Sequence, residues 1–310
     1  MKMRNKFLAL LLAVSMTCTA AACGSADNNK QDNEKQVTED TSADHENNAE
    51  DDVDVYAAAQ EKMNEIKSLN GAMTMEMDAN VSMGGETQAI HMVSTVDMSC
   101  FYDPLHFKAD VNMDAGEAGS TKMTIYAEVA DDGTYTMYMG DGTNWQSQSV
   151  QMDALKSYDA ASNMAAYMQE SYHFQDAGTE EVNGKNARKY TGVATGDDMK
   201  QLIESSGTLD SLSALGIDAS QAEAMFQDLG DLPITLWIDE TEYYPVKYEM
   251  DMTATINSLM SNMIESLGEE AAGLTMEYTK AHMSMTCSDY NAVSDFSIPD
   301  DVKEAAVPAA

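Results

Sequence analysis

The sequence predicts an α+β protein in which a long, strongly curved antiparallel sheet, a half-barrel, wraps around a few helices. Apolar and polar residues alternate along many segments, several of them ten to thirteen residues long. Such one-sided alternation between short turns is typical of antiparallel strands, because parallel strands are usually covered on both faces. Helical patterns are few, so a long sheet with one apolar face has to curl around the helices to bury that face.

The first 22 residues have the pattern of a signal peptide. A basic segment precedes the apolar run from Phe7 to Val14, which is too short to cross a hydrocarbon layer about 30 Å thick as a helix. Ala20 and Ala21 then lead through Ala22 into Cys23. This junction resembles the lipobox of bacterial lipoproteins, which implies cleavage after Ala22 and acylation of Cys23, for example with palmitate. Ala20 departs from that pattern, which prefers Leu, and ordinary secretory cleavage is the alternative.

Residues 23–54 are interpreted as the lipidated cysteine followed by an acidic, disordered tether. Residues 24–54 contain 11 acidic residues, two lysines and almost no apolar side chains. Such a segment cannot bury enough surface to offset the entropy lost on ordering. We expect a single domain over 55–302 and a short tail over 303–310.

The domain opens with a helical pattern and continues with strand patterns. Val55, Ala59, Met63, Ile66 and Leu69 recur at helical spacing, and Gly71 follows as a stop. Alternation then predicts strands over 73–83, 90–100, 105–113, 123–129, 135–139, around 145, 179–182, 185–194, 234–238, 244–256 and 274–287. Asp141-Gly142 and Asn183-Gly184 predict two-residue hairpin turns.

In the last strand the apolar residues change parity, which predicts a bulge near Lys280. Further helices are expected over 152–170, around 199–203 and over 218–229. The segment from Ile256 to Leu267 is a regular amphipathic helix. It is either a helix packed on the sheet or a lid over a cavity mouth. The lid residues would be Leu259, Met260, Met263 and Ile264.

Methionine is the most unusual feature of the composition, with 26 residues, and 15 of those occupy the apolar faces of predicted strands. They are either ordinary core residues or the lining of a concave site for an apolar ligand, because methionine adapts to ligands of variable shape. A copper(I) site is a third interpretation, since thioethers favour that ion. The candidate lining residues are Met73, Met75, Met77, Met92, Met98, Met137, Met139, Met250 and Met252.

Two cysteines remain once Cys18 is lost with the signal peptide and Cys23 is acylated. Cys100 and Cys287 both continue a methionine-rich apolar face. In an exported protein such a pair is either a disulfide or two buried thiols, and the sequence leaves both open.

The charge and the motifs exclude several classes of function. A formal charge of -36, from 53 acidic and 17 basic residues, repels a nucleic-acid backbone. No metalloprotease, nucleophile-elbow or phosphate-loop motif is present. The histidines outside the tether are isolated, and three of them fall on polar strand faces: His91, His106 and His282. We therefore expect no enzyme, no cofactor and no metal.

Several short segments carry a resemblance to a known superfamily. They are Asn183-Gly184-Lys185, Leu236-Trp237-Ile238-Asp239, Tyr244-Pro245-Val246-Lys247, Asp289-Tyr290-Asn291 and Ile298-Pro299. With the lipobox and the long meander, they resemble the extracytoplasmic lipoproteins of the LolA/LppX-like superfamily, in an uncharacterised Gram-positive branch. The resemblance implies a half-barrel whose concavity holds a lipid or another hydrophobic molecule.

The sequence therefore predicts a non-enzymatic lipoprotein held by acyl chains on the outer face of the cytoplasmic membrane of a Gram-positive cell. Its expected partners are the membrane and a lipid or other hydrophobic small molecule bound in a Met-lined concavity. The alternative is a structural or interaction lipoprotein of the cell surface with a filled core and no small ligand. No protein partner is identified.

Overall fold

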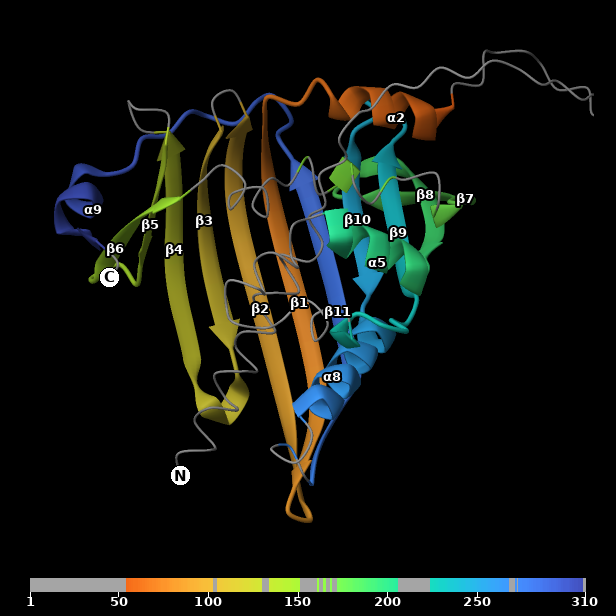
Figure 1. Cartoon of the computed structure of the whole chain (residues 1–310). Coiled ribbons are helices and arrows are strands. Elements are labelled where there is room, and N and C mark those ends of the chain that lie inside the picture. The colour runs from red at the N-terminus through yellow and green to blue at the C-terminus, as the bar shows by residue number, and fades with distance from the viewer. Residues whose placement is uncertain are drawn as a thin grey trace, which may run out of the picture.

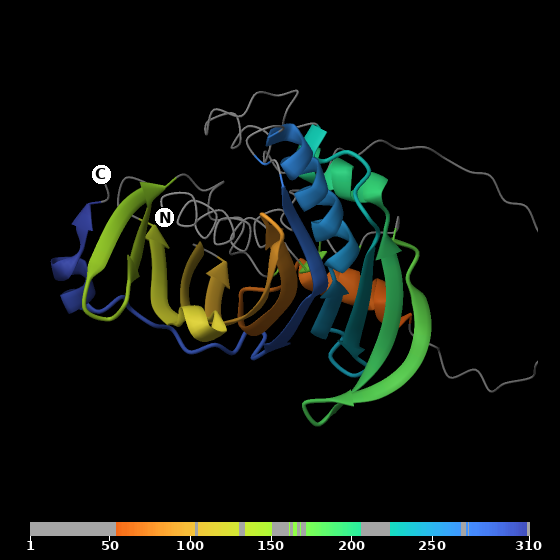
Figure 2. The ribbon, with the colours of Figure 1, turned by 90° about the horizontal axis from the view of Figure 1, so that it is seen from below.

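The computed structural model shows one continuous curved sheet with helices on its concave side (Figures 1 and 2). It describes residues 54–102, 105–129, 134–150, 161, 164, 165, 168, 172–205, 224–267, 271 and 273–308. The signal peptide, Cys23 and almost the whole tether lie outside these residues. So do most of the predicted helices over 152–170 and 218–229.

Twelve strands form the sheet, in the order β12-β6-β5-β4-β3-β2-β1-β11-β10-β9-β8-β7. All neighbours are antiparallel except β12 and β6, which are parallel. The predicted fold class is confirmed. The strands are β1 (Ser68–Met83), β2 (Glu86–Tyr102), β3 (Leu105–Asp114), β4 (Ser120–Val129), β5 (Tyr135–Gly140), β6 (Trp145–Val150), β7 (Gln175–Val182), β8 (Lys185–Ala194), β9 (Leu232–Asp239), β10 (Pro245–Asp251), β11 (Leu274–Ser288) and β12 (Val307–Pro308).

The helices are short and lie mainly over one half of the sheet. Three of them, α2, α5 and α8, lie beside the β8–β11 half (Figure 1). Seen from below, the sheet bends around α8 (Figure 2). The helices are α2 (Val55–Met63), the single turn η1 (Gly116–Ala118), α5 (Gly196–Ser205), α8 (Thr253–Leu267) and α9 (Asp300–Ala305).

The main hydrophobic core lies between these helices and the concave face of β1 and β8–β11. Helix residues such as Ala59, Ile256 and Met260 pack there against strand residues such as Met75 and Met250, all of them buried. Removing side chains of this kind from water is the principal force that holds helices against a sheet. A second, separate cluster lies on the concave face of β2–β5.

The chain end crosses the opposite, convex face. Ile298 and Val302 are buried there against Tyr126, and His106 stacks on Phe101 at a centroid distance of 4.5 Å. Beyond α9, β12 then pairs with β6. The predicted tail over 303–310 is therefore wrong as a boundary, because 303–308 are part of the helix and sheet.

Two hairpins and the bulge test the turn predictions. Asn183-Gly184 is a two-residue turn, since Val182 pairs with Lys185, and both turn residues have positive φ; this prediction is confirmed. The bulge is also confirmed: Ala79 pairs with Tyr278 and Asp78 with Lys280. The hairpin at Asp141-Gly142 exists, but the connection is longer than predicted.

The reason for the longer loop is local hydrogen bonding. Gly140 pairs with Trp145, so four residues connect β5 to β6. The Asp141 carboxylate accepts hydrogen bonds from the backbone N–H groups of Thr143 and Asn144, each at 2.8 Å. An Asp side chain used in this way closes its own turn.

Several element boundaries differ from the sequence prediction, and two of them lie at the ends of helices. The first helix ends at Met63, and Leu69 already belongs to β1. The strand predicted over 244–256 ends at Asp251, because the Asp251 carboxylate accepts the Thr253 N–H and the chain turns into α8. The expected helix from Ile256 is confirmed and begins three residues earlier.

Candidate functional site

The concave face of β2–β5 presents apolar residues in adjoining rows. The strand register places Met98, Ala109, Ile125 and Met139 in one row. Val96, Val111 and Met123 form the next row. Six of the partly buried apolar side chains in these strands form what we call the concave apolar patch: Val96, Met98, Val111, Met123, Met137 and Met139.

The nine candidate lining methionines divide into a buried and a partly buried group. Five of them are at most 8% exposed in the main core: Met75, Met77, Met92, Met250 and Met252. The other four are partly buried: Met73, Met98, Met137 and Met139. The five buried methionines therefore act as core residues, and the concave apolar patch contains three of the four partly buried ones.

Gly71 joins the two halves of the concave face. A Cβ at this position would lie 2.6 Å from Met285 Cε and 3.1 Å from Met98 Cγ. The two methionines thus occupy the space over the glycine backbone. Met285 is fixed further by the Tyr248 hydroxyl, which donates a hydrogen bond to its Sδ at 2.9 Å.

The candidate lid residues lie on α8. Met260 is 2% exposed in the main core, and Leu259 and Met263 are partly buried against the same core. Ile264 is also half-buried. This placement corresponds to the packed-helix interpretation. A lid movement stays a prediction.

The disulfide interpretation of Cys100 and Cys287 needs correction, because the structure has no disulfide between them and both side chains are buried. Cys100 pairs with Leu69 on one side of β1, and Cys287 pairs with Gly71 on the other. Two strand spacings of about 4.8 Å separate them, which is beyond the reach of a disulfide. Burial raises the pKa of the Cys287 thiol to about 12, partly offset by a hydrogen bond with Tyr290.

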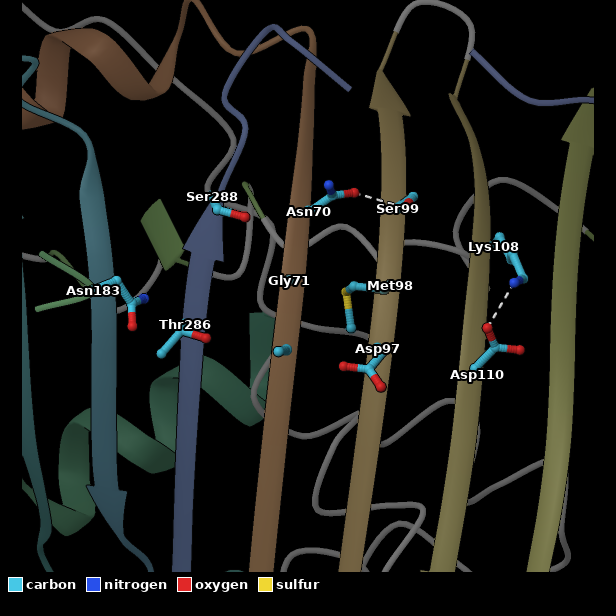
Figure 3. A pocket seen from close by; sticks show the side chains of 11 residues that line it. Asn70, Gly71, Asp97, Met98, Ser99, Lys108, Asp110, Asn183, Thr286 and Ser288 are labelled. Atoms are coloured by element: carbon cyan, nitrogen blue, oxygen red, sulfur yellow. Dashed lines mark hydrogen bonds and ion pairs between the residues drawn. The ribbon is translucent and has the colours of Figure 1, made fainter. Parts of the chain in front are cut away.

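A polar depression lies on the convex face of the same strands (Figure 3). Asp97, Ala72 and Thr286 are neighbours across β2, β1 and β11. Because the short Ala72 stands between longer side chains, the surface is hollowed there. We call this region the outer hollow. It has a volume of about 310 Å³ and is lined by Asn70, Gly71, Ala72, Asp97, Met98, Ser99, Lys108, Asp110, Asn183, Thr286 and Ser288.

Asn183 reaches the outer hollow from the turn between β7 and β8, far away in sequence. A second hollow of about 340 Å³ adjoins it and shares Asn183 and Ser288 with it. In this second hollow, Lys185 Nζ lies 3.1 Å from Asp239 Oδ2 and also pairs with Glu242. Hydrogen bonds from Lys185 to Glu242 and Asp239 raise the pKa of that lysine.

Hydrogen bonds hold several lining groups in place. Asn70 Oδ1 accepts from Ser99 Oγ at 2.7 Å, and Asn70 Nδ2 donates to Asp289 at 2.8 Å. Lys108 Nζ lies 2.6 Å from Asp110 Oδ2. Partial burial opposes the charge of Asp110, but hydrogen bonds from Lys108 and Thr124 outweigh it and lower the pKa of the carboxyl group. The same hydrogen bond to Asp110 raises the pKa of Lys108.

The sequence analysis missed the outer hollow. Apart from Gly71 and Met98, which belong to the concave face, its lining consists of outward-facing residues from β1, β2, β3 and β11 and of one turn residue. The one local signal was Ala72, a small residue at an outward position of an otherwise polar strand face. Even so, the pairing of β1 with β11 was needed to bring Thr286 beside Ala72.

A search for a metal site and for a membrane-spanning helix covers only the described part of the chain. Within them, no three His, Cys, Asp or Glu side chains are grouped to hold a metal ion. Of the helices in this part of the chain, none is both long and apolar enough to cross a membrane. His91 is exposed and bonded to Asp78 at 2.6 Å, whereas His106 is half-buried under the chain end.

The fold is a curved, mostly antiparallel sheet of twelve strands with few helices among the described residues. The model of a family of unknown function, DUF6612, matches residues 51–307. The chain belongs to this family. No curated protein gives a significant match to the sequence.

Solved structures similar to this chain include lipoproteins. The crystal structure of LprF from Mycobacterium bovis is 13% identical with a TM-score of 0.46, covering 79% of this chain and 95% of that one. The lipoprotein LppX from Mycobacterium tuberculosis is 14% identical with a TM-score of 0.40, covering 78% and 98%. The LolA superfamily protein NE2245 from Nitrosomonas europaea is 10% identical with a TM-score of 0.19, covering 80% and 96%. The LolA/LppX-like superfamily stays a prediction from the sequence, and nothing about a ligand follows from these likenesses.

Proposed function

We propose that this protein is a non-enzymatic, lipid-anchored extracytoplasmic lipoprotein that binds a lipid or another hydrophobic molecule on the concave apolar patch. One observation carries the proposal. The concave face of β1 and β8–β11 is largely buried in the main core, whereas Val96, Val111 and Met123 on β2–β5 are only partly buried. A ligand that covered these side chains would gain about 25 cal/mol for each Å² of apolar surface removed from water.

The residue types of the patch support an apolar ligand of variable shape. Four of the six side chains are methionines, which are unbranched, polarizable and able to repack against different surfaces. The sites of small apolar ligands are generally concave and lined by such side chains. The proposed role is retention or carriage of the ligand, which requires no chemical step.

The anchor supports the proposed location. The lipobox-like junction at Ala22 and Cys23 would attach acyl chains outside the cytoplasmic membrane, and each buried CH₂ of such a chain contributes about 0.8 kcal/mol to membrane binding. A protein held there lies next to a supply of lipid. The location in a Gram-positive envelope rests on the sequence resemblance.

Native mass spectrometry of the full chain purified from its own membranes tests the proposal. We expect a co-purifying apolar molecule and uptake of a fluorescent fatty acid after delipidation. Met123→Glu should weaken uptake by about tenfold or more, because burying a carboxylate under an apolar ligand is costly. Asn112→Glu is the matched control, since Asn112 lies on the convex face of β3 next to the row of Met123.

The opposite result would favour the alternative of an interaction lipoprotein with a filled core. Absence of any co-purifying apolar molecule, together with no uptake by the unmodified chain, would overturn the ligand proposal. Equal loss of uptake in both variants would show that the added charge, and not its place on the concave face, is responsible.

A further inference from the structure

We propose that the outer hollow is a second binding site, on the opposite face of the sheet from the concave apolar patch, and that it binds a neutral saccharide. The inference goes beyond lipid binding and does not depend on it. The observation behind it is a polar depression lined by Ala72 and by hydroxyl, amide and carboxylate side chains, among them Thr286, Asn183 and Asp97 (Figure 3).

The fold builds this hollow from parts that are distant in sequence. Asp97, Ala72 and Thr286 lie side by side on three neighbouring strands, and the next row contains Ser99 and Asn70. Asn183 comes from the two-residue turn between β7 and β8. The volumes of about 310 and 340 Å³ for this hollow and the one beside it are at the lower end of the range for small-molecule sites.

Some of the lining groups are fixed and others are available. Asn70 is held by Ser99 and Asp289, which orients the floor of the hollow. The side chains of Asp97, Asn183 and Thr286 make no hydrogen bond to any residue that the structure describes. Together they offer carboxylate acceptors, an amide with a donor and an acceptor, and a hydroxyl that can be either.

This mixture of groups matches a sugar hydroxyl better than a charged group. A hydroxyl both donates and accepts, so neighbouring hydroxyls can satisfy Asp97 and Asn183 at once. An ammonium group only donates and would leave the Asn183 N–H groups without an acceptor. The hollow therefore selects a ligand that carries several neutral donor–acceptor groups.

Charge argues against an anionic ligand. Lys108 is paired with Asp110 at 2.6 Å, and Lys185 in the adjoining hollow is paired with Asp239 and Glu242. Both lysines thus already have carboxylate partners, and Asp97 forms no ion pair with the described residues. The whole chain, at -36, would also repel a phosphate or sulfate group.

Binding of neutral oligosaccharides to the full mature chain, followed by saturation-transfer NMR and calorimetry, tests the proposal. The probes are maltotetraose, cellotetraose and the N-acetylglucosamine tetramer. Ala72→Tyr fills the hollow from its floor without removing any contact, and we expect it to weaken binding by about tenfold or more, as the loss of one or two good hydrogen bonds would. Asn80→Tyr is the matched control, because Asn80 is an outward residue of the same strand outside the hollow.

A second substitution separates a neutral ligand from a cationic one. Asp97→Asn keeps a hydrogen-bonding group but removes the charge, so saccharide binding should change by only about threefold. Binding of the glucosamine tetramer alone, abolished by Asp97→Asn, would overturn the proposal in favour of a cation site. Failure of all three neutral probes, or equal binding by Ala72→Tyr and the unmodified chain, would also overturn it. Fatty-acid uptake by Ala72→Tyr should stay unchanged, which keeps this test separate from the lipid proposal.

Discussion

The side-chain amide of Asn257 binds both backbone polar groups of Tyr278. Asn257 Nδ2 donates to the Tyr278 carbonyl at 2.8 Å, and the Tyr278 N–H donates to Asn257 Oδ1 at 2.8 Å. The neighbouring strand β10 ends at Asp251 and pairs with β11 only as far as His282. The helix side chain thus replaces the missing strand at this point of the sheet, which is how α8 is fixed against β11.

Asn257→Ala should destabilise the fold by about 2 to 4 kcal/mol. It removes both bonds from a residue that is 3% exposed, and each buried backbone group left without its partner costs about 1 to 3 kcal/mol. Urea unfolding followed by circular dichroism measures the loss. Ser261→Ala, at an exposed position of the same helix, should change stability by less than about 0.5 kcal/mol. Equal stability of Asn257→Ala and the unmodified chain would show that the amide clamp contributes nothing.

The buried thiol of Cys287 should make stability fall at high pH. Its pKa is raised to about 12 in the fold, against about 8.5 in an unfolded chain. Between these values the unfolded state has lost the proton and the folded state has kept it, so stability falls as pH rises. Below the unfolded value the contribution is fully present.

Cys287→Ala should reduce the pH dependence of the unfolding free energy between pH 9 and 11 by up to about 1.4 kcal/mol per pH unit, the value for one proton. Urea titrations at several pH values give the slope. Met283→Leu is the control, since Met283 is buried on the same strand face and has no proton to lose. Parallel slopes for Cys287→Ala and the unmodified chain would contradict the assignment of a protonated thiol.

If acyl chains on Cys23 anchor the protein, removal of that cysteine should change where the protein is found. Cys23→Ala should release the protein into the medium, because no thiol is then available for acylation at the cleavage site. Fractionation of cells followed by immunoblotting measures the released share. Cys18→Ala is a matched control within the signal peptide and should leave the protein with the membrane. A Cys23→Ala chain that stays membrane-bound would contradict lipid anchoring.

The sequence could predict those features that depend on one strand or one turn. Alternation located the strands, and the change of parity near Lys280 located the bulge. The predicted end of the first helix was wrong because one residue fits two patterns. Leu69 continues the helical spacing, but it also has the parity of Met73 on β1. The outer hollow could not be predicted, because it requires Ala72, Thr286 and Asn183 to meet through the pairing of β1 with β11 and the curl of the β7–β8 hairpin.

The bulge at Thr279 keeps the apolar side chains on both sides of it on the concave face of β11, and a deletion can test this role. Thr279 is the unpaired residue between Tyr278 and Lys280. With it, Tyr278 and Ala281 both face the concave core, where they are 3% and 0% exposed. Without Thr279, the pairing register of one half of β11 would shift by one residue. The apolar side chains of that half would then point to the convex face.

Deletion of Thr279 should therefore cost more than about 4 kcal/mol, well above an ordinary point change, because it exposes several core side chains at once. Thr279→Ala keeps the residue count and loses a side chain that is exposed, so its cost should stay below about 1 kcal/mol. Thermal and urea unfolding of the two variants compare the effects. A deletion variant as stable as Thr279→Ala would mean that β11 tolerates either register. The alternation of apolar and polar residues along β11 would then not determine which face is buried.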